Sequence, residues 1–175
     1  RAKLGIARTF QTSKLFQGLT VRENLYTSLR QALGEKKISW LANPSESDRL
    51  RTESTSILER VDLLKKADVL VSDISHGESR QLEVAMALAM RPKILMLDEP
   101  AAGISPTERG RLVDLLKSLD KDMTLILIEH DMAVALAVAD DVIVMHDGTM
   151  FMQGSPDEVR NSSAVRDLYL GSNHE

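Results

Sequence analysis

Apolar residues recur at a spacing of four in several stretches of the chain, and these stretches are predicted helices. Leu25, Leu29 and Leu33 form the first such stripe. A second helical pattern covers 45–64, with charged residues on its other face, and a third helix begins at Ser75. Each stripe gives its helix one face that can be buried.

From Lys93 onward, short apolar runs alternate with helical patterns. Ile94 to Leu97 is a continuous apolar run, as expected of a strand buried on both faces of a mostly parallel sheet. Further strands are predicted at 6–10, 124–129, 142–145 and 149–152. The last two flank Asp147-Gly148, which is a hairpin turn signal. Repeated strand–helix units with short links indicate a layered α/β core.

Four predicted helices begin with the same signal, a Ser or Thr followed three residues later by Glu. In this capping box, the hydroxyl and the carboxylate each accept a backbone N–H at the helix start. The pairs are Thr20/Glu23, Ser75/Glu78, Ser105/Glu108 and Ser155/Glu158. Proline follows the serine in the last two pairs, which suits the first helical position.

The composition of the 175 residues is that of a globular protein, with 43% hydrophobic and 27% charged residues. This length suits one domain, or one and a half closely packed subdomains. No apolar run reaches about 18 residues, the length that spans a bilayer. The absence of cysteine excludes zinc fingers, disulfide frameworks and cysteine nucleophiles. The net charge of −4 gives no reason to expect nucleic-acid binding.

Two adjacent carboxylates, Asp98 and Glu99, follow the apolar run at 94–97. A buried strand delivers its last residues to the carboxyl edge of the sheet, where α/β proteins bind ligands. Like charges side by side repel each other, and a Mg²⁺-nucleotide would compensate them. The alternative is an acidic pair that faces solvent.

Ser75, followed by Gly77, leaves free backbone amides at a helix start, which is a ready site for an anion. The alternative is a plain capping box made by Ser75 and Glu78. The acidic pair at 98–99 favours the anion site, because a phosphate would suit both features.

Five segments together resemble the ATP-binding subunits of ABC transporters. Gln11 matches the Q-loop glutamine, and His130 matches the switch histidine of the H-loop. The other three are ISHGE at 74–78 for the signature motif, ILMLDE at 94–99 for Walker B with the catalytic glutamate, and AAGIS at 101–105 for the D-loop. Each motif alone is weak, whereas five in register are hard to produce by chance.

This resemblance implies an α/β fold, namely the C-terminal part of a P-loop NTPase-like ABC ATPase core with an inserted α-helical subdomain. It divides the chain into four segments: 1–11 up to the Q-loop, 12–92 as the helical signature subdomain, 93–153 as the RecA-like core, and 154–175 as a helical tail. The cofactors it implies are ATP and Mg²⁺.

The resemblance also implies site residues. Glu99 would polarise the attacking water, and His130 would contact the γ-phosphate or that water. Asp98 and Gln11 would hold Mg²⁺. The signature turn would contact ATP held by a second subunit, and its residues are Ser75, His76, Gly77 and Glu78, with Ser105 in the D-loop.

Three positions depart from the family pattern. His76 and Glu78 replace a glycine and a glutamine of the usual signature, and Ser105 stands where the D-loop usually has aspartate. Glu78 would repel a triphosphate unless it turned back into its capping role. Ser105 suits the N-cap of the next helix, which leaves its contact across the dimer open.

A Walker A loop is absent, since no pair of glycines five apart is followed by Lys and Ser or Thr. Without that loop the β- and γ-phosphates lose their main cradle. The chain begins at Arg1 as if in the middle of a domain. We therefore expect a fragment that begins after Walker A and is inactive alone, with ATPase activity in the full-length parent.

Several longer stretches resemble ATPase subunits of branched-chain amino-acid importers, among them GIARTFQ, LFQGLTVRENL, EPAAGISP and the insertion around Trp40. Urea or other amide importers share much of this pattern. The implied partners are a second ATPase subunit (a copy or a paralogue), transmembrane permease subunits that dock near 12–18 with Phe16, and indirectly a solute-binding protein. The implied location is cytoplasmic, on the inner face of the cell membrane.

Two other classes remain as alternatives. One is a DNA-associated ABC ATPase, against which the lack of a coiled coil, a basic face and zinc cysteines weighs. The other is a non-catalytic interaction module, for which an upstream GxxxxGK[ST] would be the decisive counter-observation.

Overall fold

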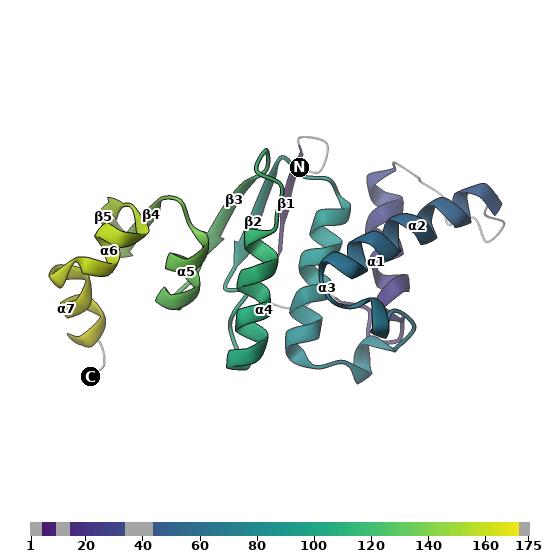
Figure 1. The fold of residues 1–175 in the computed structure, drawn as a ribbon, viewed down its shortest axis with the longest axis horizontal. Helices are drawn as coiled ribbons and strands as arrows, with labels where there is room; N and C mark the ends of the chain where they lie inside the picture. Colours follow the sequence, from purple (N-terminus) through teal and green to yellow (C-terminus); the bar gives the residue numbers. More distant parts are fainter. Residues whose placement is uncertain (1–4, 10–14, 34–43, 172–175) are drawn as a thin grey trace. The chain divides into compact units, whose positions relative to one another are not determined.

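The computed structural model describes residues 5–9, 15–33 and 44–171. The chain forms two compact units, Arg1–Ile128 and Glu129–Glu175 (Figure 1). The predicted insertion around Trp40 lies outside the described residues. Within the described part, none of the helices has both the length and the apolar character that a membrane crossing requires.

The first unit contains a three-stranded parallel sheet in the order β1-β2-β3. The strands are β1 (Ile6–Arg8), β2 (Ile94–Asp98) and β3 (Thr124–Ile128). Asp98 pairs with Ile128 in the register of β2 and β3. Because all three strands run the same way, the residues that follow them emerge at one edge of the sheet.

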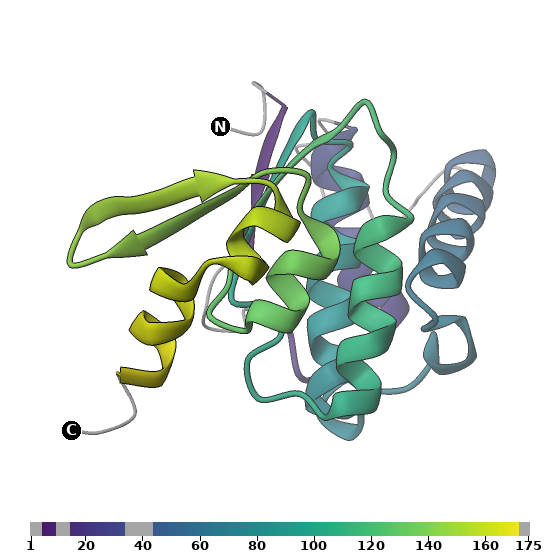
Figure 2. The same ribbon diagram turned by 60° about the vertical axis from the view of Figure 1, so that its left-hand side comes forward.

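The two faces of this sheet differ in burial. Leu95 and Leu97 are fully buried, whereas Met96 on the opposite face is only half-buried. Ile126 and Ile128, in register with Met96 and Asp98, are 41% and 50% exposed. Within the first unit, burial of β2 is therefore complete only on the face along which α3 and α4 lie, and partial on the other (Figures 1 and 2).

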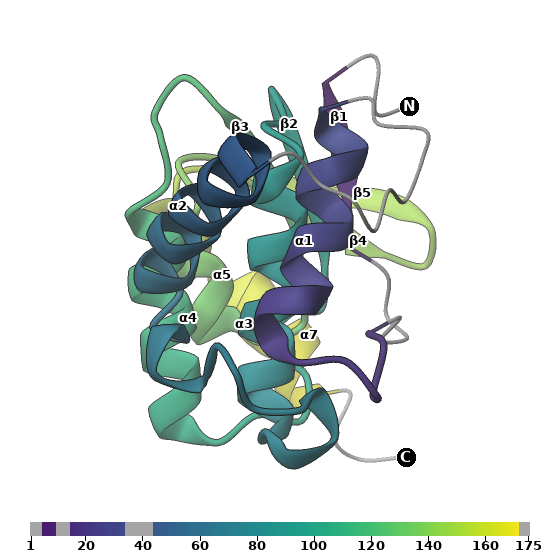
Figure 3. The same ribbon diagram turned by 90° about the vertical axis from the view of Figure 1, so that its right-hand side faces the viewer.

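Three helices connect β1 to β2 and pack on one another. They are α1 (Val21–Ala32), α2 (Pro44–Arg60) and α3 (His76–Ala89), with 3-10 turns η2 (Leu64–Lys66) and η3 (Val71–Asp73) between α2 and α3. In Figure 3, α1 and α2 lie in front of α3. Leu25, Leu29, Leu58 and Leu82 are fully buried between them, as the apolar stripes predict. Helix α4 (Pro106–Lys117) connects β2 to β3.

Helix α2 ends at Arg60, so the prediction of a helix to residue 64 is wrong. Asp62 adopts a φ of +56°, which the helix cannot accommodate. The Leu63 amide donates to the Leu58 carbonyl at 2.8 Å, and the Asp62 amide donates to Glu59 at 3.1 Å. These two bonds form a Schellman motif, which satisfies the last carbonyls of the helix.

All four predicted capping boxes are present. In each, the hydroxyl of the N-cap residue accepts the amide of the glutamate, and the carboxylate accepts the amide of the N-cap residue. The helix starts are therefore fixed by local sequence at residues 20, 75, 105 and 155.

The second unit consists of α5 (Met132–Val138), the hairpin of β4 (Val142–His146) and β5 (Thr149–Gly154), α6 (Pro156–Asn161) and α7 (Ser163–Gly171). Figure 2 shows the hairpin as a long pair of strands. Asp147 and Gly148 have φ of +47° and +74°, as a type I′ turn requires, so the predicted hairpin is confirmed. A small core of Val144, Val159 and Val165 holds the unit together.

Candidate functional site

The turn that opens α3 is built around Ser75. Its hydroxyl accepts the Glu78 amide at 3.1 Å, and its own amide donates to Glu78 Oε2 at 2.8 Å. Lys66 Nζ lies 2.8 Å from Glu78 Oε1. The Glu78 carboxylate is thus turned back into its capping role and paired with a cation. A phosphate can approach the turn only if Glu78 does not repel it, and this arrangement meets that condition.

The ionisation of Glu78 follows from these contacts. Burial raises its pKa, but the hydrogen bonds from Lys66 and from the Ser75 amide outweigh burial and hold the pKa below the ordinary value of 4.5. Glu78 is therefore an anion at neutral pH whose charge is largely offset by Lys66.

A second carboxylate, from α4, reaches the same turn. The Ser75 hydroxyl donates to Glu108 Oε1 at 2.8 Å, while Ser105 donates to Glu108 Oε2 through its amide at 2.9 Å and its hydroxyl at 2.7 Å. A Cβ added at Gly77 would collide with the Glu108 carboxylate. Glycine at 77 therefore leaves room for a carboxylate against the helix start.

These bonds also fix the charge of Glu108. The hydroxyl and the amide of Ser105, followed by the hydroxyl of Ser75, lower its pKa from 4.5 to about 2. The segment that carries Ser105 also passes close to the turn at Gly103, where an added Cβ would lie 3.4 Å from the His76 ring. The predicted signature turn and the predicted D-loop thus lie together within one chain.

The acidic pair lies at the carboxyl end of β2. Arg8 Nη2 lies 3.1 Å from Asp98 Oδ2, so an arginine partly compensates this carboxylate. The Glu99 amide donates to the Ile128 carbonyl at 2.8 Å, and Glu99 has a φ of +47°. A non-glycine residue in this region is strained, and such strain is concentrated at functional sites.

The carboxylate of Asp98 at this edge of the sheet suits Mg²⁺ that is bound together with a nucleotide. The part of the chain that the structure describes contains no cluster of three acidic or histidine side chains that could hold a metal alone. Mg²⁺ in phosphate sites needs only one or two protein carboxylates, because phosphates and water supply the other ligands. Asp98, half-buried at the sheet edge, offers one such carboxylate.

The remaining predicted site residues are placed as follows. Gln11 lies outside the described residues. His130 is exposed and belongs to the second unit, two residues after β3 ends. Asp131 next to it caps α5, since its Oδ1 accepts the amides of Ala133 and Val134.

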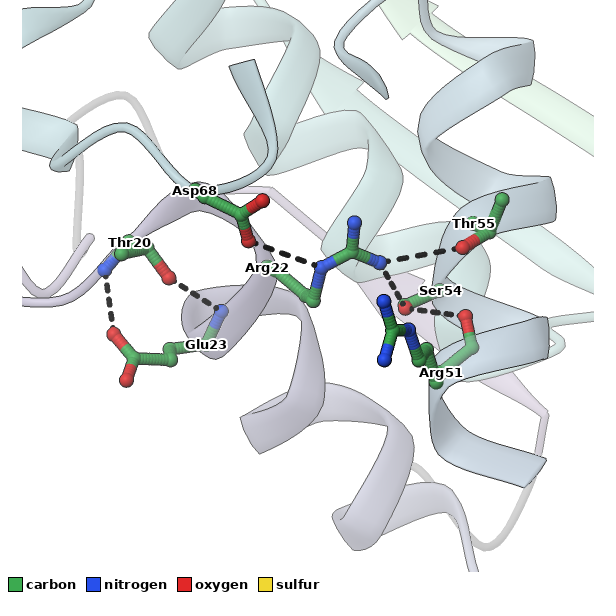
Figure 4. Close-up of polar contacts among 7 residues, drawn as sticks. All are labelled: Thr20, Arg22, Glu23, Arg51, Ser54, Thr55 and Asp68. Carbon is green, nitrogen blue, oxygen red and sulfur yellow. Dashed lines mark hydrogen bonds and ion pairs between the residues drawn. The ribbon is translucent and has the colours of Figure 1, made fainter. Parts of the chain in front are cut away.

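Arg22, which no sequence pattern singles out, connects α1 to α2 and to the loop that follows α2. Arg22 Nη1 donates to Ser54 Oγ at 3.1 Å and Thr55 Oγ1 at 3.2 Å on α2 (Figure 4). Its Nε lies 3.5 Å from Asp68 Oδ1, in the loop that follows α2. Ser54 is fully buried and also donates to the Arg51 carbonyl. No periodic pattern marks such a contact.

The segment before α1 is joined to the segment before α3 by backbone hydrogen bonds. The amides of Val21 and Arg22 donate to Val69 and Ala67, and the Val71 amide donates to Leu19 at 3.0 Å. The chain at 19–22 and the chain leading to Ser75 are therefore held together by their backbones.

The loop before α1 is held by Asn24, which is fully buried. Its Oδ1 accepts the Phe16 amide at 2.8 Å, and its Nδ2 donates to the carbonyls of Phe16 and Thr20 at 3.0 Å. Phe16 itself is 56% exposed. The loop thus presents an aromatic side chain on a fixed backbone.

The fold and this site define an ATP-binding cassette. The crystal structure of MJ1267, described as an ATP-binding cassette of an ABC transporter in its ADP conformation, superposes with a TM-score of 0.77. The identity is 26%, and the match covers 97% of this chain and 70% of MJ1267. The predicted fold class is confirmed.

Sequence similarity identifies the family. A family model described as ABC transporter matches residues 1–102, and the chain belongs to this family. It is 38% identical over 176 residues to the high-affinity branched-chain amino acid transport ATP-binding protein LivG of Salmonella typhimurium, covering 97% of this chain and 69% of LivG. The corresponding protein BraF of Pseudomonas aeruginosa is 34% identical with the same coverage. The predicted resemblance is confirmed, while the individual site roles stay predictions.

Proposed function

We infer that the chain serves in an ATP-hydrolysing subunit that drives import of branched-chain amino acids. The observation that carries this proposal is the similarity to LivG, which extends over 97% of the chain and includes both the acidic pair and the turn at Ser75. Because other subunits choose the solute, the assignment to branched-chain amino acids rests on this similarity alone.

The first part of the proposed mechanism is activation of water at the edge of the parallel sheet. Glu99 accepts a hydrogen bond from the attacking water and takes up its proton as the water oxygen forms a bond to the γ-phosphorus. The bond between that phosphorus and the β–γ bridging oxygen breaks, and ADP leaves. His130 contacts the γ-phosphate or the water.

Asp98 and Gln11 are the residues proposed to hold Mg²⁺. When bound, the ion would neutralise charge on the β- and γ-phosphates. Asp98 is half-buried, and its Oδ2 lies 3.1 Å from Arg8 Nη2, so its carboxylate is held at the sheet edge where a metal ligand is needed.

The second part is recognition of the nucleotide by a second subunit. The turn of Ser75, His76, Gly77 and Glu78 offers a hydroxyl and helix N-terminal amides to the γ-phosphate of ATP bound by the partner. Ser105 in the D-loop lies at the same face. The capping role of Glu78 and its ion pair with Lys66 support this role, because Lys66 offsets the charge that would repel the nucleotide.

The four predicted segments, 1–11, 12–92, 93–153 and 154–175, are kept as the proposed functional division. Permease subunits are proposed to dock at the loop with exposed Phe16, which Asn24 holds in place. The subunit is accordingly proposed to lie on the inner face of the cell membrane. A solute-binding protein takes part indirectly.

Mg-ATP binding and hydrolysis test the proposal. The chain is compared with a version extended upstream through its coding sequence, each with a Glu99→Gln control. We expect activity in the extended form and its loss in the control. Inactivity of both forms, with the Ser75 turn folded, would instead support a non-catalytic interaction module.

A further inference from the structure

The Ser75 turn already holds an anion that belongs to the chain itself. Glu108 Oε1 accepts the Ser75 hydroxyl at 2.8 Å, and its carboxylate lies where a Cβ of Gly77 would be. Glu108 therefore occupies the side of the helix start at which an incoming phosphate would be recognised.

A phosphate and Glu108 compete for the same donor. The Ser75 hydroxyl has one hydrogen, and that hydrogen is directed at Glu108 Oε1. Its oxygen already accepts the Glu78 amide, so the hydroxyl has no second donor function to offer. Two anions cannot both lie against the same turn without strong repulsion.

The Glu108 carboxylate can release the Ser75 hydroxyl without unfolding α4. Its other oxygen, Oε2, is held by the amide and the hydroxyl of Ser105 on its own helix, and these bonds form the local capping box. Release of Ser75 thus leaves the helix start capped. The group that moves is the end of a flexible side chain.

We propose that Glu108 is an autoinhibitory counter-anion, which occupies the Ser75–Gly77 turn in the single subunit and must be displaced by the γ-phosphate of the partner's ATP. This inference rests on the proposed function of that turn and adds a step to it. Because Glu108 and Ser105 share one capping box, displacement also breaks the hydrogen bond that connects this capping box to Ser75.

The test is ATP-driven dimerisation of the complete subunit, extended upstream, in the Glu99→Gln background. Sedimentation velocity gives the ATP concentration at half-dimerisation. Glu108→Gln keeps the capping geometry and removes the charge. Glu108→Asp keeps the charge but is too short to reach Ser75 while capping Ser105. We expect both variants to lower the half-point by about three- to tenfold, since a charge-assisted hydrogen bond no longer has to be broken.

The matched controls are Glu158→Gln and Glu158→Asp. Glu158 forms the same Ser-Pro-x-Glu capping box on α6, with the Ser155 amide at 2.8 Å and the Ser155 hydroxyl at 2.7 Å. These controls should leave the half-point unchanged. If only Glu108→Gln lowers the half-point, the charge of Glu108 merely repels ATP and the proposal is overturned. It is also overturned if neither Glu108 variant changes the half-point.

A second readout separates failure of this inference from failure of the proposed function. If the Glu99→Gln parent does not dimerise with ATP, the proposed function fails, and inorganic phosphate is then titrated against single subunits while the Gly77 amide is followed by NMR. Glu108→Asp should show a saturable shift at several-fold lower phosphate than the parent. Equal titrations in the two proteins would refute the occupancy of the turn by Glu108.

Discussion

Single side chains set the charge at the Ser75 turn. Glu108 is exposed to solvent on one side yet receives three hydrogen bonds, from Ser105 and Ser75. Each of these donors favours the ionised carboxylate, which is why its pKa falls to about 2.

Acid titration of Glu108 is the first prediction at this scale. Its pKa in the folded chain lies below the ordinary value of 4.5, so the ionised group stabilises the fold fully above that pH. The contribution should disappear as the pH falls from about 4.5 to about 2. Carboxyl ¹³C NMR of the folded chain should show a Glu108 midpoint at the lower end of this window, at about 2. A midpoint near 4.5 would contradict the hydrogen bonds from Ser75 and Ser105.

The second prediction at the scale of single residues concerns the replacement of Gly77 by alanine. The new Cβ would collide with the Glu108 carboxylate, which is a movable side-chain end, so we expect Glu108 to swing away and its pKa to rise. Gly110→Ala on α4 is the control, because a Cβ there meets nothing within 4 Å. This control should leave the pKa unchanged and stabilise the helix by about 0.5–1 kcal/mol. An unshifted pKa in Gly77→Ala would disprove the close approach.

At the level of elements, Arg22 connects α1 to α2 and to the loop before η3. Its side chain is 16% exposed and contacts Ser54, Thr55 and Asp68 (Figure 4). Removal of the guanidinium would leave the hydroxyls of Ser54 and Thr55 without this donor between packed helices, and such a loss lowers stability.

Arg22→Met should therefore lower the free energy of unfolding by about 1–3 kcal/mol. The matched control is Arg49→Met, because Arg49 pairs with Glu53 on the exposed side of α2 with 56% of its side chain accessible. An exposed pair of this kind contributes up to about 0.5 kcal/mol. Urea denaturation of both variants gives the comparison, and equal losses would show that Arg22 has no special role in joining the helices.

The elements that local sequence determines could be predicted, and those set by distant contacts could not. The capping boxes and the Asp147-Gly148 turn depend on residues within four positions, and all of them are present. The end of α2 could not be predicted, because Asp62 gives no strong stop signal in sequence. The bond between Ser75 and Glu108 joins residues 33 positions apart, so the sequence showed only the local capping role of Glu108.

Over the whole molecule, the two units differ in how much apolar surface they bury. The first unit buries large side chains such as Leu25, Leu82 and Leu95 completely. The second has a core of three valines, while Ile143 and Met145 on its hairpin are 54% and 58% exposed. Less buried apolar surface means less protection against local opening.

Hydrogen exchange should accordingly be slowest in α3 and β2 and faster in β4 and β5. Val144→Ala should accelerate exchange throughout 132–171, because it removes part of the small core of that unit. If the two units unfold independently, exchange in α3 will be unaffected. Acceleration of α3 to the same extent would show instead that the chain unfolds as one cooperative unit.

The left-handed backbone at Glu99 has a consequence for laboratory evolution of this protein. A φ of +47° disfavours a glutamate by about 1–2 kcal/mol, whereas Asn and Gly adopt it easily. A variant library screened only for heat resistance should therefore enrich Asn or Gly at position 99. Such a screen would discard the proposed catalytic carboxylate while improving the fold, so any stabilisation programme has to hold this position fixed or select for turnover at the same time.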